Sequence, residues 1–216
     1  MNDFELLYDE IHRCRKCQKM DKIKALRKIE FVNTKADVFV ISQSLARDTL
    51  RKSGINFVLE NGNLGRTGNN LEKFLKKFDR TVYPKKDNTI YNSEVTQCYP
   101  GKAVKGNGDR KPSSEEIFNC QSFFLRELQL IKPKLILLMG KTSRDCFYGY
   151  FLKGISFPKS LTEHINQILQ RGVDHFESDG IKSAIIPIQH ASGMNPHYSK
   201  MIENEKLCSM IKRILH

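Results

Sequence analysis

The sequence predicts an α/β fold, a three-layer α/β/α sandwich around a central, mostly parallel four-stranded sheet. Short runs of β-branched and apolar residues alternate along the chain with longer stretches of helical periodicity, which is the pattern of strands joined by helical crossovers. Two of the runs are almost continuously apolar, as expected for parallel strands that are buried on both faces. With 216 residues, 39% of them hydrophobic, and no internal repeat, the chain fits one domain over residues 1–216.

The individual elements follow from these runs in chain order. The expected strands are residues 36–42 (ADVFVIS), 89–98 (TIYNSEVTQC), 134–140 (KLILLMG) and 184–189 (AIIPIQ). The expected helices are residues 69–78, 113–131, 141–150, 160–170 and 200–215. Ser113 and Glu116 form a capping-box pattern at the start of the second helix, and Pro133 ends that helix before the third strand.

The charge of the chain suggests what it binds. It carries 36 Lys and Arg against 24 Asp and Glu, a net charge of +12, so its field attracts polyanions, and nucleic acid is the first partner to consider. A basic surface can also serve solubility or contact acidic lipid. The chain has no long apolar run and no signal-peptide pattern at its start. We therefore expect a soluble, cytoplasmic protein with nucleic acid rather than a membrane as its partner. We also expect a monomer.

The loop expected at residues 99–112 (YPGKAVKGNGDRKP) is rich in Gly, Pro and Lys. It is either a solvated connection or a DNA-facing loop, because loops at the carboxyl ends of parallel strands usually build the functional site.

The six cysteines are too few for a disulfide scaffold, and an intracellular protein keeps its thiols reduced. Metal ligation is then the leading interpretation for some of them. Cys14 and Cys17 form the sequence CRKC, whose spacing lets two thiolates reach one metal centre, and the basic residues around them favour the thiolate form. One such pair is half of a metal site.

Several segments, taken in order, resemble the uracil-DNA glycosylase superfamily, and most of all its iron–sulfur family-four branch. They are CRKC, ISQSLARD (residues 41–48), NLGRTGNNLEKFL (63–75), YNSEVTQCYP (91–100), residues 111–142 and IQHASGMNP (188–196). The block 111–142 is the most specific, because it joins a Pro, an acidic helix start, a cysteine and an IKPK segment to an apolar strand that ends in Gly. The resemblance implies a DNA glycosylase, an enzyme that flips a nucleotide out of the stack and hydrolyses its N-glycosidic bond.

The resemblance maps four metal ligands onto Cys14, Cys17, Cys98 and Cys120. It implies a [4Fe–4S] cluster, which is held by four thiolates, and a tetrahedral zinc ion is the alternative that the same ligands allow. The cluster would tie the N-terminal segment to the sheet. The remaining thiols, Cys146 and Cys208, are expected to be small buried apolar side chains.

The resemblance also assigns roles to the segment HASGMNP. His190 would stabilise the negative charge that develops on O2 of the departing pyrimidine, and Met194 would be the wedge that enters the base stack. Ser192 and Asn195 would hold phosphates. Arg66, Lys102 and Lys105 complete the expected DNA contacts.

The first loop departs from the family pattern. Relatives resemble Gly-Glu-Ala-Pro-Gly or Gly-Gln-Asp-Pro there, whereas this chain has SQSLA at residues 42–46. Gln43 and Ser44 remain to orient water, and Asp48 is the nearest carboxylate able to act as a base, unless it only caps a helix.

The base-recognition positions depart as well. Asn63 stands where relatives have a Phe on which the base stacks, and Glu94 stands where they have the uracil-reading Asn. An ionised carboxylate only accepts hydrogen bonds, so Glu94 favours a cytosine-type base with its N4 amino group. A protonated Glu94 could donate to O4 of uracil, which would make uracil the substrate. A local shift of the alignment would make Asn92 the residue that reads the base.

Three hypotheses remain open. The first is a monofunctional DNA glycosylase with altered specificity, acting in repair or in antiphage defence on a modified cytosine-type base. The second is a non-catalytic DNA-binding protein that recognises lesions or ends, and the third is a basic RNA-binding or structural protein of similar fold.

Overall fold

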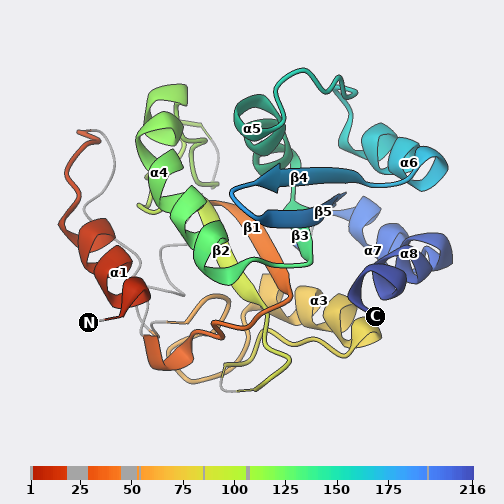
Figure 1. The fold of residues 1–216 in the computed structure, drawn as a ribbon, viewed down its shortest axis with the longest axis horizontal. Helices are drawn as coiled ribbons and strands as arrows, with labels where there is room; N and C mark the ends of the chain where they lie inside the picture. The colour runs from red at the N-terminus through yellow and green to blue at the C-terminus, as the bar shows by residue number, and fades with distance from the viewer. Residues whose placement is uncertain are drawn as a thin grey trace.

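The computed structural model describes residues 2–18, 29–44, 53, 55–84, 86–105, 108–193 and 195–216. Its centre is a five-stranded sheet in the order β2-β1-β3-β5-β4 (Figure 1). The strands are β1 (Val38–Ser44), β2 (Tyr91–Thr96), β3 (Leu135–Met139), β4 (Asp174–Ser178) and β5 (Ile181–Ile188). All neighbouring pairs are parallel except β4 and β5, which are antiparallel. The predicted α/β fold with a mostly parallel sheet is therefore confirmed.

The predicted number of four strands is wrong, because β4 forms a hairpin with β5. Asp179 and Gly180 connect the two strands with φ angles of 49° and 78°, the left-handed backbone that an Asp-Gly hairpin turn requires. β4 escapes a search for apolar runs because its residues alternate between buried and exposed positions at the edge of the sheet.

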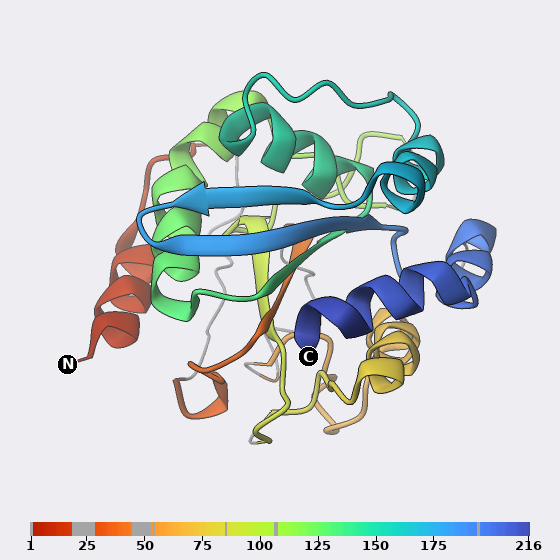
Figure 2. The ribbon, with the colours of Figure 1, turned by 45° about the vertical axis from the view of Figure 1, so that its right-hand side comes forward.

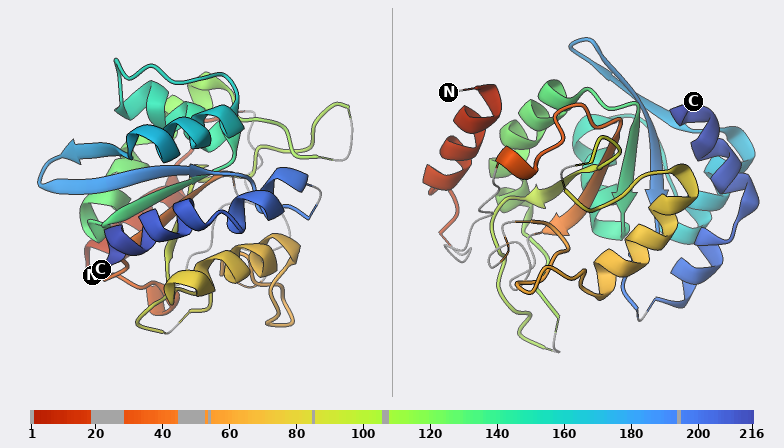
Figure 3. Two further views of the ribbon diagram at one scale, coloured as in Figure 1. Left: turned by 90° about the vertical axis from the view of Figure 1, so that its right-hand side faces the viewer. Right: turned by 90° about the horizontal axis from the view of Figure 1, so that it is seen from below.

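Helices cover both faces of the sheet. They are α1 (Asp3–Arg13), α3 (Arg66–Leu75), α4 (Ser114–Ile131), α5 (Lys141–Phe151), α6 (Leu161–Arg171), α7 (Pro196–Ile202) and α8 (Glu205–Leu215), with short 3₁₀ helices η1 (Ile29–Phe31) and η2 (Lys76–Phe78). Helices α4 and α5 lie on one face and α3 and α8 on the other (Figures 2 and 3). Within the described part of the chain, no helix is both long and apolar enough to cross a membrane.

Several helix boundaries differ from the prediction for local reasons. The expected helix 200–215 is two helices, because the side chain of Asn204 accepts a hydrogen bond from the Leu207 N–H and starts α8. Helix α3 begins at Arg66, three residues before the expected start. Helix α1 was not predicted, although Asn2 and Glu5 form a capping box at its start.

Side chains along β1 and β2 alternate between the two faces of the sheet. Val38 and Val40 pack in the core with α3, whereas Phe39 and Ile41 pack with α4 and α5. Ser42 and Ser44 follow Val40 with the period of two that a strand imposes, so they lie on the α3 side. Ser42 is paired in register with Glu94 of β2.

A buried carboxylate joins β2 to α4. Glu127 of α4 is fully buried and accepts hydrogen bonds from the Tyr91 hydroxyl at 2.7 Å, from Gln97 Nε2 at 3.2 Å and from Ser93 Oγ. The hydroxyl of Tyr8 on α1 lies 3.0 Å from that of Tyr91. This network gives hydrogen-bond partners to a polar group that would otherwise be costly to bury, and it connects β2 to α4.

Candidate active site

A cavity of 490 Å³ opens at the carboxyl ends of β1 and β3. This is the edge of an open parallel sheet at which ligand sites usually lie. The volume is within the range of roughly 300–1,000 Å³ that is common for small-molecule sites. The cavity is lined by Ser42, Gln43, Ser44, Phe57, Leu59, Gly65, Arg66, Thr67, Gly68, Asp109, Met139 and His190. The structure thus brings together four of the predicted site residues, Gln43, Ser44, Arg66 and His190.

His190 follows β5 and lies against the backbone at the end of β3. Gly140 has a φ of 91°, and a Cβ there would lie 3.4 Å from His190 Cβ and 3.5 Å from its Cδ2. The N–H of Ser192 donates to His190 Nδ1 at 3.2 Å, so the proton of the neutral ring is on Nε2. Burial lowers the pKa of His190 below its usual value. The side chain is therefore a neutral hydrogen-bond donor through Nε2.

The rest of the predicted HASGMNP segment is held by its own contacts. Asn195 caps α7 by accepting from the His197 N–H, and its Nδ2 donates to the carbonyl of His190 at 3.2 Å. Ser192 is half-buried. Met194 lies outside the described residues, so its predicted role as a wedge stays a prediction, as do the phosphate contacts of Ser192 and Asn195.

Helix α3 supplies a cation beside this segment. A Cβ at Gly193 would lie 2.5 Å from Arg66 Cδ, so the exposed Arg66 side chain runs across the backbone of Gly193. One turn further along α3, Asn70 Nδ2 donates to the Ala191 carbonyl at 3.0 Å. The start of α3 and the His190 loop therefore form one rim of the cavity.

The end of β1 brings polar but uncharged groups to the cavity. Ser42 Oγ donates to the Ser93 carbonyl at 3.4 Å, and Gln43 Nε2 donates to the Arg110 carbonyl at 3.5 Å. Asp48, predicted as the nearest carboxylate, lies outside the described residues.

The expected basic loop contains a hairpin, which projects from the body of the protein (Figure 3). Lys102 pairs with Asp109 in an antiparallel bridge, and its Nζ lies 2.9 Å from Asp109 Oδ1. Lys105 is exposed nearer the tip. Asp109 lines the cavity, a position that the sequence does not reveal, because it depends on how the hairpin folds back toward the end of β1.

The two candidate base readers are hydrogen-bonded to each other. Glu94 is 2% exposed and accepts from Asn92 Nδ2 at 3.1 Å. Asn92 Oδ1 is buried and has no hydrogen-bond partner among the residues that the structure describes. Glu94 lies on the same side of the sheet as Ser42, but neither it nor Asn92 is in the wall of the large cavity.

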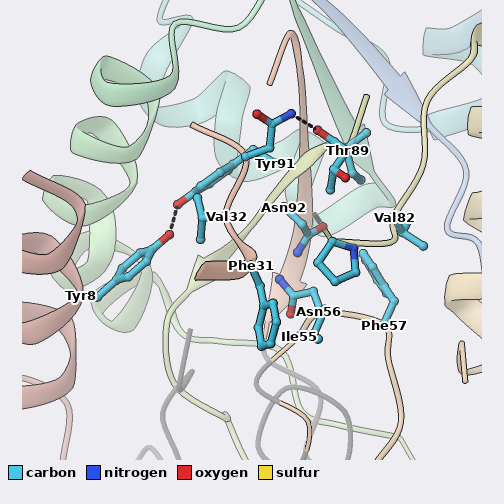
Figure 4. A pocket seen from close by; sticks show the side chains of 13 residues that line it. Tyr8, Phe31, Val32, Ile55, Asn56, Phe57, Val82, Thr89, Tyr91 and Asn92 are labelled. Atoms are coloured by element: carbon cyan, nitrogen blue, oxygen red, sulfur yellow. Dashed lines mark hydrogen bonds between the residues drawn. The ribbon is translucent and has the colours of Figure 1, made fainter. Parts of the chain in front are cut away.

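Asn92 lines a smaller cavity of 60 Å³, next to Asn56 and Phe57 (Figure 4). Phe57 lines both cavities and lies between them. Its φ is 65°, an uncommon value for a bulky residue, and its carbonyl accepts from the Gly65 N–H at 2.8 Å. A Cβ at Gly68 would lie 2.7 Å from Phe57 Cβ, so glycine allows this close approach.

Asn63, the predicted replacement of the stacking aromatic, is exposed and is absent from the wall of the cavity. The aromatic ring of this site comes instead from Phe57, six positions earlier. Sequence reasoning missed Phe57 because nothing in its local pattern indicates an inward-facing ring.

Cys120 interacts electrostatically with the three other predicted metal ligands. Burial, together with smaller contributions from Cys98, Cys17 and Cys14, raises the pKa of Cys120 to about 12. Asn119 Nδ2 contacts Cys17 Sγ at 3.6 Å. Among the described residues, no three His, Cys, Asp or Glu side chains lie close enough together to hold a metal ion.

The two other cysteines are half-buried rather than fully buried, and they pack against apolar clusters on opposite faces of the sheet. Burial raises the pKa of Cys146 to about 12, so this thiol is protonated and behaves as an apolar side chain.

Comparisons with known proteins point in the same direction as the geometry. The sequence model described as the Uracil DNA glycosylase superfamily matches residues 29–215. A type-4 uracil-DNA glycosylase of Archaeoglobus fulgidus is 25% identical over 151 residues, which are 70% of this chain and 66% of that protein, just under two thirds of its length. A type-4 uracil-DNA glycosylase of Saccharolobus solfataricus is 23% identical over 208 residues, which are 95% of this chain and 84% of that protein.

Proposed function

Because the chain belongs to the uracil-DNA glycosylase superfamily, we propose that it is a monofunctional DNA glycosylase whose active site is the cavity at the ends of β1 and β3. The observation that carries the proposal is the state of His190. Its ring is half-buried at the cavity wall, neutral, and oriented by the Ser192 N–H so that Nε2 donates. A donor held in this way is suited to an oxygen that gains negative charge.

The reaction uses this donor in a single displacement. Water adds at C1′ of the flipped nucleotide, the C1′–N bond breaks, and its electron pair leaves with the base. The Nε2–H of His190 hydrogen-bonds the base oxygen that receives this charge. Removal of one preorganised donor of this kind costs about 100- to 1,000-fold in rate. Arg66 and Lys105, both exposed near the cavity mouth and on the hairpin, contact the DNA backbone.

We infer that the base is a cytosine derivative read by Glu94, which is buried behind the cavity wall and is paired in register with the lining residue Ser42. The Asn92 amide donates to Glu94 Oε1. Glu94 is therefore the acceptor in this hydrogen bond, which is the role of an ionised carboxylate. Such a group pairs with the N4 amino group of cytosine and repels O4 of uracil. The role that follows is excision of a modified cytosine-type base from foreign or phage DNA. Uracil, read by a protonated Glu94 or by Asn92, is the alternative substrate.

The donor chemistry of the four cysteines fits an iron–sulfur cluster. One buried thiol, Cys120, is influenced by three others from two other segments, and four thiolates are what a [4Fe–4S] cluster requires. Cys14, Cys17, Cys98 and Cys120 would hold it. When bound, the cluster supplies a cross-link between the N-terminal segment, the end of β2 and α4, and no part of the bond cleavage.

Metal content tests this assignment. The purified protein should contain about four iron atoms per chain with matching sulfide. Cys120→Ser should lose the iron, and the matched variant Cys208→Ser should keep it. A colourless, active preparation that contains zinc would show that the four cysteines hold zinc instead of an iron–sulfur cluster.

A second candidate function is DNA binding without catalysis, and the uncharged end of β1 favours it. A substrate panel separates the two. Duplex and single-stranded oligonucleotides that carry uracil, cytosine, hydroxymethylcytosine or glucosylated cytosine are scored for alkali-labile abasic sites. The expected result is strand cleavage at a cytosine derivative, and only after alkali treatment. Cleavage at uracil would show that uracil is the substrate instead. No abasic site in any oligonucleotide, with DNA binding retained, would refute the glycosylase and favour the binding protein.

A further inference from the structure

The end of β1 leaves the proposed reaction without a proton acceptor. Gln43 and Ser44 carry an amide and a hydroxyl, which orient water but do not take up its proton at neutral pH. Among the described residues that line the cavity, one carboxylate is present, that of Asp109. It comes from the hairpin between β2 and α4, a different segment from the first loop.

Two donors hold the Asp109 carboxylate by one of its oxygens. The Tyr99 hydroxyl donates to Oδ1 at 2.8 Å, and Lys102 Nζ donates to the same atom at 2.9 Å. Tyr99 is 3% exposed, and burial, followed by the bond to Asp109, raises the pKa of its phenol, which keeps the hydroxyl proton in place. Among the described residues, none donates a hydrogen bond to Oδ2. The Asp109 side chain is 29% exposed. Oδ2 is therefore the oxygen available to water.

The backbone beside Asp109 is anchored at two points. The Arg110 guanidinium forms two hydrogen bonds to the Glu116 carboxylate, at 2.7 Å and 2.6 Å, at the start of α4. On the other side, the carbonyl of Arg110 accepts from Gln43 Nε2 at the end of β1. These contacts fix the base of the hairpin next to Gln43, so the carboxylate and the amide share one part of the cavity wall.

We propose that Asp109 is the catalytic base of this enzyme, because the described end of β1 carries only an amide and a hydroxyl; this inference rests on the proposed function. Gln43 orients the attacking water and Asp109 Oδ2 accepts its proton. The water O–H bond breaks as the O–C1′ bond forms, the C1′–N bond breaks, and the electron pair leaves with the base that His190 holds. The negative charge of Asp109 also stabilises the positive charge that develops on the sugar.

The test compares Asp109→Asn with Asp109→Glu and with Asp87→Asn. Asp87 is an exposed carboxylate ahead of β2, at the opposite end of that strand from the cavity, so it controls for the same loss of charge. Single-turnover excision is measured at neutral pH, DNA affinity by fluorescence anisotropy, and folding by thermal melting. The substrate is the oligonucleotide that the wild-type protein cleaves fastest.

Asp109→Asn should slow excision by about 100-fold or more while DNA affinity and melting stay close to wild type. Asp109→Glu should retain part of the rate, and Asp87→Asn all of it. If Asp109→Glu folds and is as slow as Asp109→Asn, the role in catalysis is wrong.

The outcomes separate this inference from the proposed function. An active wild-type protein with an equally fast Asp109→Asn variant would overturn the role of Asp109 and leave the glycosylase in place. A folded, DNA-binding wild-type protein that excises no base would overturn both.

Discussion

His164 provides a sharp test of the packing, because it is a titratable base that is fully buried. It is fully buried on α6, stacks on Phe157 at a centroid distance of 5.6 Å and meets the edge of Tyr148 at 4.9 Å. Neither ring nitrogen has a hydrogen-bond partner within the described parts of the chain. Burial, together with the nearby Arg144, lowers the pKa of His164 from 6.5 to about 4, although Asp174 opposes the change.

The pKa difference makes stability depend on pH. The unfolded chain takes up a proton at this histidine near pH 6.5 and the folded chain only near pH 4, so between these values the unfolded state binds more protons. The stability contribution is therefore complete above pH 6.5 and is lost as the pH falls toward 4. At 1.36 kcal/mol for each pH unit, His164 alone should cost about 2.5 kcal/mol between pH 7.5 and 4.5.

Urea unfolding of the wild-type protein and of His164→Leu measures this cost. Acid also protonates carboxylates, but that loss is common to both proteins, so the difference between their unfolding free energies isolates His164. The wild type should lose about 2.5 kcal/mol more than the variant over this range, whereas His175→Gln, at an exposed position on β4, should follow the wild type. Parallel curves for wild type and His164→Leu would refute the neutral buried histidine.

Further predictions concern the site. Glu94→Asn should shift base preference toward uracil in a mixed-substrate competition, because an amide can donate to O4 and accept from N3–H; an unchanged ratio would contradict the reader role. Arg66→Ala and Lys105→Ala should each weaken DNA binding and reduce the slope of log K against log[salt] by about 1, and an unchanged slope would mean that the side chain does not contact phosphate. Gly140→Ala should lower the free energy of unfolding by about 1–2 kcal/mol and slow excision, because it strains a φ of 91° and crowds His190; wild-type stability and rate would show that this contact is unimportant.

Much of the fold could be predicted because it depends on local pattern. The core strands can be recognised in the sequence as apolar runs, and the Ser113 capping box starts α4 at the expected place. Strand β4 could not be found in this way, since an edge strand with one wet face lacks an apolar run, although the Asp179–Gly180 pair was a usable hairpin signal.

The site was predictable where a residue follows directly from a strand end, as His190 follows β5. Phe57 and Asp109 could not be predicted, because each reaches the cavity through a turn or hairpin whose position depends on distant contacts. The Phe57 turn approaches Gly68, and the Asp109 hairpin is fixed by Arg110 and Glu116. Asn63 illustrates the converse: an aligned position need not face the same cavity.

The most direct test of the central claim is the effect of His190→Ala on excision and on DNA binding, measured on the best substrate of the panel. The account predicts that single-turnover release of the base slows by about 100-fold or more, while the Kd for the same DNA stays within about twofold, because His190 acts on the leaving base rather than on the backbone. A variant that folds, binds and excises at the wild-type rate would contradict the assignment of this cavity as the active site.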